Sequence, residues 1–200
     1  LSGYFSETSK NGVMITAPGG VSILKEGAPD LPVFTTSIQI PDLAKMQLEV
    51  ISSEYIDVRV ESVIPSRGNI TRDININLVP FKKGLAYDKN SFYPDNIAFL
   101  RSPYIIRTKR GQTVVFQPFQ YNPIDGILRV HTNITISVKA DGISTDNPLV
   151  RLPSKNRGMR EMEEIYSRHF LNNVPTNERY TPLDENGAML IICYGPFIDA

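Results

Sequence analysis

Cysteine and histidine are nearly absent from this sequence of 200 residues. It holds one cysteine, Cys193, and two histidines, His131 and His169. A single cysteine excludes an intrachain disulfide, and its place inside an apolar run predicts a buried thiol rather than a nucleophile. Neither histidine has a second Cys or His at ligand spacing, so we predict a half-exposed strand residue at 131 and a helix-surface residue at 169. The sequence therefore predicts no metal, no cofactor and no catalytic residue, and this chain alone is not expected to be an enzyme.

The sequence also lacks an excess of charge of one sign and any long apolar run. The 21 basic and 21 acidic residues cancel, so no overall field would attract nucleic acid or an anionic membrane. No apolar segment approaches the length of a membrane span. Residues 1–4 show neither the basic nor the apolar part of a secretion signal, so if the protein is exported, we expect that its signal has already been removed.

Residues 1–140 carry the pattern of an all-β domain. Apolar and polar or β-branched residues form many short strand-like segments. These segments lie at 12–16, 21–24, 31–40, 46–50, 55–60, 73–78, 103–107, 112–116 and 127–138. Turns rich in Gly and Pro separate them, and Lys109-Arg110-Gly111 is predicted to be a hairpin turn. Many short strands joined by hairpins predict an antiparallel β-sandwich.

Residues 141–179 are predicted to be a linker followed by one amphipathic helix. Asp, Asn, Ser, Pro and Lys are frequent over 141–157, which is typical of a linker. Over 158–172, apolar residues recur at helical spacing. They are Met159, Met162, Ile165, Tyr166 and Phe170. This stripe predicts docking against a core, which either the sandwich or a further domain could supply.

The sequence changes character at Arg179-Tyr180. Downstream, residues 188–194 are continuously apolar, which predicts a strand buried on both faces, as in a parallel sheet covered by helices. Such a strand needs partners and none follow, so we expect residues 180–200 to open an α/β domain whose remainder lies outside this sequence. Because an exposed arginine between two domains is a natural proteolytic site, Arg179-Tyr180 is the predicted processing site.

Two arginines, Arg67 and Arg72, lie on a predicted surface loop. Pro65 and Gly68 favour a turn ahead of the strand expected at 73–78. A guanidinium offers a carboxylate a planar, permanently charged fork of donors that lysine cannot copy. Either arginine could fill an acidic pocket of a partner. The plainer interpretation is two arginines in solvent, where each contributes little.

The aromatic residues allow a different function. A sugar platform would need several of them on one exposed face, whereas in a strand-rich region they are more often core. The candidates are Phe92, Tyr93, Phe99, Tyr104, Phe116, Phe119 and Tyr121. A carbohydrate- or surface-binding β-sandwich is therefore the alternative function, and the front of an enzyme of some other class is a third hypothesis.

A series of short motifs runs in a fixed order along nearly the whole chain. They are Glu26-Gly27-Ala28-Pro29-Asp30-Leu31-Pro32, Val50-Ile51-Ser52-Ser53, Ile64-Pro65-Ser66-Arg67-Gly68, Phe92-Tyr93-Pro94, Arg110-Gly111-Gln112, Gln120-Tyr121-Asn122-Pro123 and Arg179-Tyr180-Thr181-Pro182. In this order and spacing, the chain resembles the N-terminal prodomain of the gingipain-type cysteine endopeptidases, most closely the arginine-specific members.

The resemblance implies a secreted or cell-surface zymogen. In that family the prodomain is a β-sandwich that binds the catalytic domain of the same precursor, assists its folding and blocks its active site with a basic loop residue. Arg72 best matches that residue by its distance from the junction, and Arg179-Tyr180 matches the maturation site. The catalytic domain of the family has a caspase-like α/β fold. Its His and Cys would lie beyond Ala200, and Cys193 does not match the nucleophile.

The sequence and the resemblance together divide the chain into three parts. Residues 1–140 are the expected β-sandwich prodomain. Residues 141–179 are the expected linker and helix, ending at the processing site. Residues 180–200 are the expected start of the catalytic domain, the partner of the prodomain.

Overall fold

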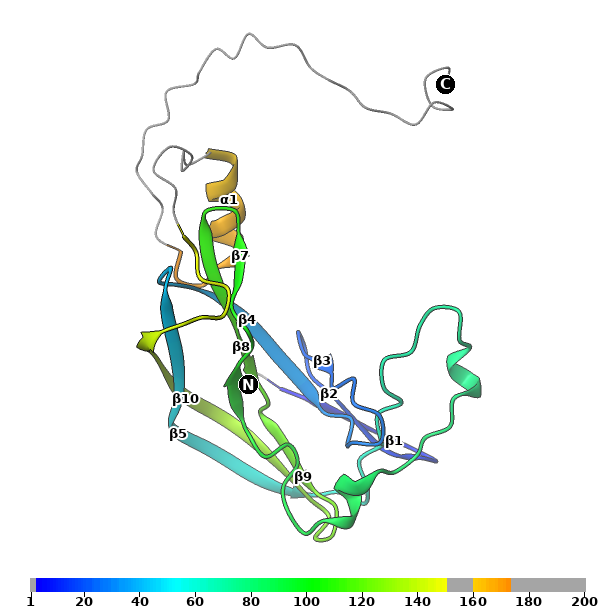
Figure 1. Cartoon of the computed structure of the whole chain (residues 1–200). Coiled ribbons are helices and arrows are strands. Elements are labelled where there is room, and N and C mark those ends of the chain that lie inside the picture. Colours follow the sequence, from blue (N-terminus) through cyan, green and yellow to red (C-terminus); the bar gives the residue numbers. More distant parts are fainter. Residues whose placement is uncertain (1–2, 151–159, 174–200) are drawn as a thin grey trace, which may run out of the picture.

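The chain forms an elongated antiparallel β-sandwich, seen in a computed structural model that describes residues 3–150 and 160–173 (Figure 1). One sheet has the order β5-β10-β9, and the other has the order β3-β4-β8-β6, with β7 also paired to β8. The strands β1 and β2 form a separate hairpin. All pairs of named strands are antiparallel, which confirms the predicted all-β sandwich.

The bounds of the elements follow the chain in order. They are β1 (Phe5–Ser9), β2 (Gly12–Thr16), β3 (Val21–Ser22), β4 (Pro32–Ile40), β5 (Ala44–Arg59), the 3-10 helices η1 (Ile76–Leu78) and η2 (Leu85–Asp88), β6 (Ala98–Leu100), β7 (Tyr104–Ile106), β8 (Lys109–Phe116), β9 (Phe119–Asn122), β10 (Ile127–Ile143) and the helix α1 (Arg160–His169). Within these described residues, no helix is long and apolar enough to cross a membrane.

The main hydrophobic core lies at the end of the sandwich that carries the β1–β2 hairpin. Alternate residues of β2, β9 and the first part of β10 point into it, because successive side chains of a strand face opposite ways. Its buried members are Val13, Ile15, Ala17, Leu31, Val63, Tyr87, Phe119, Tyr121, Leu128 and Val130. The Tyr87 hydroxyl donates to the Val63 carbonyl at 2.7 Å, so this tyrosine is buried with its polar atom paired.

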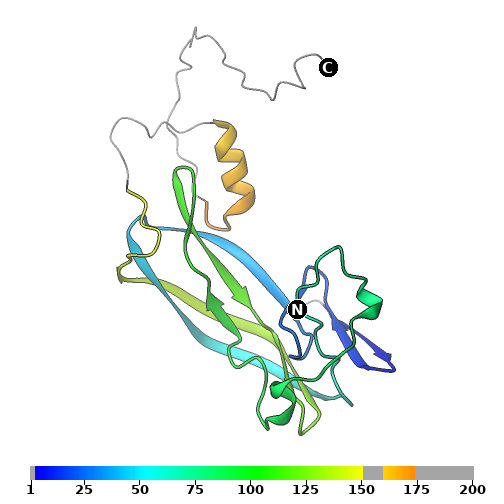
Figure 2. The same cartoon turned by 45° about the vertical axis from the view of Figure 1, so that its right-hand side comes forward.

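The helix α1 sits at the opposite end of the molecule, against the β7–β8 hairpin (Figure 2). Tyr166 of its apolar stripe and Phe170, the residue that follows the helix, pack on the sandwich and are buried, while Ile165 is half exposed. The sequence allowed either the sandwich or a further domain as the partner of this stripe. For Tyr166 and Phe170 the partner is the sandwich. The helix is shorter than the periodic stretch 158–172 because α1 ends at His169.

The prediction of a strand at 73–78 is wrong. These residues are all exposed, and part of the segment forms η1, which Asn75 caps by accepting from the amide of Asn77. Alternation of polar and apolar residues defines a strand only where another strand pairs with it, and none does so here among the described residues. The alternation instead places Ile74, Ile76 and Leu78 in solvent, with exposures of 48, 49 and 79%.

The hairpin turn predicted at Lys109-Arg110-Gly111 is displaced. The turn lies at Arg107 and Thr108, and Arg107 takes the left-handed conformation with φ of 53°. Lys109 and Arg110 are already the first residues of β8, and both are buried. Charge usually marks a solvated hairpin tip. These two cations are exceptions because each finds partners within the fold, as described below.

Candidate functional site

The feature that stands out from the sandwich is the loop of residues 66–84, here called the Arg72 loop. It leaves the body between β5 and η2 and projects away from both sheets (Figure 1). Its two ends are tied to one short segment of the body. The Gly27 amide donates to the Ser66 carbonyl and the Ser66 amide to the Ala28 carbonyl, at 2.9 and 2.7 Å, while the Gly84 amide donates to the Gly27 carbonyl at 2.9 Å.

Glycine is required where the loop meets the body at Gly27 and Gly84. Gly27 has φ of +76°, and a Cβ placed on it would lie 3.1 Å from the backbone of Gly84. A side chain at either position would push the Gly84 end of the loop away from the Gly27 segment of the body. The close approach of these two glycines therefore fixes the base of the loop.

Arg67 braces the interior of the loop. Its Nη1 donates to the Ile76 carbonyl at 2.6 Å and lies 3.5 Å from that of Val79, and its guanidinium sits 4.3 Å from the centre of the Phe81 ring. Burial raises the pKa of the neighbouring Asp30, and the charge of Arg67 offsets part of that rise. Arg67 is therefore not the solvated arginine that the sequence allowed. It joins the start of the loop to its end.

Arg72 has the opposite environment. It is exposed and occupies the first central position of a turn in which the Ile74 amide donates to the Thr71 carbonyl at 3.1 Å. No hydrogen bond or ion pair joins it to another described residue. Next to it, a hydrogen bond from Thr71 lowers the pKa of Asp73. The structure thus places Arg67 and Arg72 on one loop, with Arg67 holding its shape and Arg72 pointing to solvent.

Exposed apolar residues follow Arg72 along the same loop. Ile74, Ile76 and Leu78 are exposed on the loop, and Leu85 follows it with 81% exposure. Exposed apolar residues that gather in one place are typical of contact surfaces. The loop therefore carries an arginine with no described partner together with exposed apolar side chains, a combination suited to a partner pocket that has an acidic floor and apolar walls.

The other residues singled out in the sequence lie apart from this loop. His131 is buried rather than half-exposed as predicted, and His169 lies exposed on α1, in agreement with the prediction. No three His, Cys, Asp or Glu side chains gather into a metal-binding group in residues 3–150 and 160–173. Arg179, Tyr180 and Cys193 lie outside the described residues.

The aromatic residues do not form the exposed platform that a sugar-binding surface would need. Phe119 and Tyr121 belong to the core, and Tyr104 stacks on Phe170 with ring centres 6.4 Å apart. Phe92 covers the guanidinium of Arg129 at 4.1 Å. Of the seven candidates, six are buried or partly buried, and Phe99 is 36% exposed. The geometry therefore does not favour the carbohydrate-binding alternative.

The fold and the loop define a class of protein: an antiparallel β-sandwich that presents an arginine without a described partner on a braced projection. The sequence matches the family Propeptide_C25 over residues 5–170. The chain belongs to this propeptide family, which confirms the resemblance drawn from the motifs.

Relatives of known identity support the same assignment. The chain is 37% identical over 175 residues to gingipain R1 of Porphyromonas gingivalis, covering 86% of this chain and 17% of that protein. It is 36% identical over 189 residues to gingipain R2 of the same species, covering 93% of this chain and 25% of that protein. The chain thus corresponds to a small part of the length of these relatives.

Solved structures agree with the fold. A complex of the Porphyromonas gingivalis RgpB pro- and mature domains contains a chain that superposes with a TM-score of 0.72 at 31% identity, covering 85% of this chain and 86% of that one. A structure on the zymogenic latency of gingipain K, also from Porphyromonas gingivalis, superposes with a TM-score of 0.56 at 21% identity, covering 70% and 81%. The second likeness concerns the fold alone.

Proposed function

We propose that this chain is the inhibitory and folding-assisting prodomain of a secreted cysteine endopeptidase zymogen, and that Arg72 blocks the active site of the catalytic domain in the same precursor. The observation that carries the proposal is the contrast between the two loop arginines. Arg67 is occupied with loop carbonyls and an aromatic ring, whereas Arg72 is exposed with no described partner.

The bracing of the loop supports inhibition physically. A flexible loop would lose conformational entropy when its arginine entered a pocket, and that loss would weaken binding. Arg67, the capped 3-10 helix η1 and the glycine contact at the base hold the loop before any partner binds. Arg72 is then presented at little further entropic cost, and its planar fork suits a carboxylate at the bottom of a pocket.

The inhibition constant of the isolated prodomain against its cognate catalytic domain tests the role of Arg72. We expect Arg72→Ala to lose about 2 to 5 kcal/mol of binding, or about 30- to 5,000-fold in the inhibition constant, because the pocket carboxylate is left unpaired. Arg72→Lys should recover only part of this loss, since it restores the charge and not the fork. Arg101→Ala, at another exposed arginine, is the matched control and should change little.

Arg67→Ala has a separate expected outcome. It should weaken inhibition by about tenfold or less, because it removes bracing worth about 1 kcal/mol rather than the group that enters the pocket. Equal potency of the wild type and Arg72→Ala would reject the pocket-filling mechanism. A large loss for Arg67→Ala together with no loss for Arg72→Ala would transfer the role to Arg67.

A further inference from the structure

His131 lies buried at the centre of a hydrogen-bond network that joins three strands. The side chain is 5% exposed on β10 and lies opposite Tyr55 of β5 in the ladder. Its Nδ1 is 2.5 Å from Oγ of Ser53 on β5, and its Nε2 is 2.9 Å from Oε1 of Gln120 on β9. Gln120 in turn donates from its own Nε2 to the Pro94 carbonyl at 2.7 Å.

These contacts fix the protonation state that suits the site. The amide nitrogen of Gln120 donates to the Pro94 carbonyl, so its Oε1 faces the imidazole and must accept. Nε2 of His131 therefore carries the hydrogen, and Nδ1 accepts from the Ser53 hydroxyl. In this neutral form every hydrogen bond of the network has one donor and one acceptor without any rearrangement.

A proton added at Nδ1 would meet an unfavourable environment. Burial, followed by the charge of Arg129, lowers the pKa of His131, and Asp57 opposes this effect. The Asp57 carboxylate stabilises a charged His131 only weakly, because both its oxygens already accept from Arg129, at 2.8 and 2.9 Å. The Ser53 hydroxyl would also have to rotate so that its oxygen could accept from the new N–H.

Among the described residues, the remaining neighbours of His131 are uncharged or lie at the surface. Tyr55 meets the imidazole edge to face at 5.6 Å and also covers Arg129. Gln120 of β9 is uncharged. Glu54 on β5 and Asp95 beside Pro94 are exposed carboxylates in solvent.

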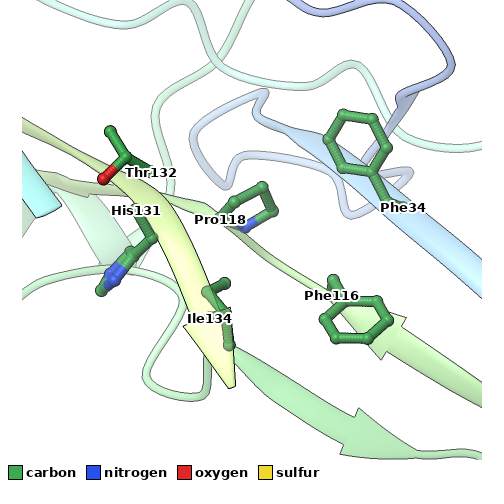
Figure 3. Close-up of a pocket in the computed structure, with 6 residues that line it drawn as sticks. All are labelled: Phe34, Phe116, Pro118, His131, Thr132 and Ile134. Carbon is green, nitrogen blue, oxygen red and sulfur yellow. The ribbon is translucent and has the colours of Figure 1, made fainter. Parts of the chain in front are cut away.

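The network holds the sheet where its ladder is interrupted. The pairing of β10 with β5 shifts register between His131 and Asn133. Next to this interruption lies an apolar pocket of about 190 Å³, whose lining residues are Phe34, Phe116, Pro118, His131, Thr132 and Ile134. Figure 3 shows the His131 ring directed away from Phe34 and Phe116 across this pocket. Side-chain contacts of His131 therefore join β5, β10 and β9 where ladder bonds and dense packing are both reduced.

We propose that His131 is a proton-operated switch that loosens the β5-β10-β9 sheet as the medium becomes acidic. Its pKa is lowered in the folded chain, whereas the unfolded chain titrates near the ordinary value of about 6.5. The unfolded state therefore binds the proton first, so stability is complete above about pH 6.5 and falls as the pH drops toward the folded-state pKa. Each unit of difference between the two pKa values reduces the folding equilibrium constant tenfold.

This switch bears on latency if the proposed prodomain function holds. A loosened sheet would hold the catalytic domain less firmly in an acidic medium. The experiment uses the present chain alone, so its result does not depend on that function.

Urea unfolding of the chain between pH 7.5 and pH 5 tests the switch. The wild-type midpoint should fall steadily below about pH 6.5. In His131→Asn, which can still accept from Ser53, and in His131→Gln, which can still donate to Gln120, that fall should disappear. The exposed histidine provides the control, since His169→Gln should keep the wild-type pH dependence. Asp30 cannot imitate the effect, because a carboxyl whose pKa is raised on folding favours the folded state as the pH falls.

If a variant does not fold, nitrogen NMR of the imidazole rings can measure the protonation state and pKa of His131 directly in the wild type. At pH 7, His131 should be neutral with its hydrogen on Nε2, and it should titrate below 6.5. An ordinary or raised pKa for His131 would overturn the proposal. So would a wild-type midpoint that stays constant between pH 7.5 and pH 5, or a pH dependence that persists in both His131 variants.

Discussion

At the scale of single residues, the most constrained side chain is Arg110. Its guanidinium is completely buried and donates to four backbone carbonyls. Nε and Nη2 bond to Asn147 and Asp146 at 2.8 Å each, and Nη1 bonds to Pro41 and Ala44 at 3.0 and 2.6 Å. One side chain therefore joins β8 to the start of β5 and to the segment after β10.

Removing the guanidinium should be costly. Arg110→Met leaves several carbonyls without their donor, and each buried unpaired group costs about 1 to 3 kcal/mol, so we expect a loss of about 3 kcal/mol or more in urea unfolding. Arg110→Lys should lose a similar amount, because one ammonium cannot reproduce the fork. The control is Arg101→Met at an exposed position, which should stay within about 0.5 kcal/mol of wild type. An unchanged midpoint for Arg110→Met would contradict this account.

At the scale of elements, the attachment of α1 depends on the absence of a side chain in β8. A Cβ on Gly111 would lie 2.4 Å from Cε1 of Phe170 and 2.8 Å from the Tyr104 ring. Phe170 therefore packs directly on the backbone of β8. Lys109 strengthens the contact, since its Nζ lies 4.7 Å from the centre of the Tyr166 ring and donates to Asn173 at 2.6 Å.

A double-mutant cycle measures this attachment. We expect Gly111→Ala to displace α1 and raise hydrogen exchange of its amides, and Phe170→Ala to cost about 3 kcal/mol or more. In the Phe170→Ala background, Gly111→Ala should reduce the free energy of unfolding clearly less than in wild type, because the ring nearest to the new Cβ is absent. Part of the cost should remain through Tyr104. Equal costs in both backgrounds would mean that Phe170 does not fill the place above Gly111.

At the scale of the whole molecule, α1 and its tail tie the last described residues to the sandwich. The Asn172 side chain accepts from the Gln39 amide at 2.7 Å and donates to the Gln39 carbonyl at 2.9 Å. The division of the chain at residue 140 stays a prediction. Because β10 continues to Ile143 and Arg110 uses the carbonyls of Asp146 and Asn147, we expect the stable unit to extend to about residue 150.

The processing site also remains a prediction, and limited digestion tests it. An arginine-specific protease should release a fragment that begins Tyr180-Thr181-Pro182, identified by N-terminal sequencing. The Arg72→Lys variant removes the exposed loop arginine as a competing site. The larger fragment should still unfold cooperatively, since its attachment through α1 is intact. Cleavage at Arg151 and Arg157 with the Arg179-Tyr180 bond left whole would show that the junction is elsewhere.

The sequence by itself determined the features that depend on neighbouring residues. Alternation of apolar and polar residues predicted a β-rich body, and apolar spacing predicted α1, because both patterns express the local geometry of one element. Pro65 and Gly68 placed Arg67 and Arg72 on a surface loop. The ordered motifs also identified the family.

Only the tertiary structure decided the features that depend on residues distant in the chain. The segment 73–78 alternates like a strand but has no described partner, and strand pairing is not encoded in the strand itself. Arg67 and Arg72 look alike in sequence, yet only Arg67 reaches the Ile76 carbonyl and the Phe81 ring. Arg110 and His131 are buried because carbonyls, hydroxyls and amides from other strands satisfy them. A polar side chain is buried only where such partners converge, and that convergence is a property of the complete fold.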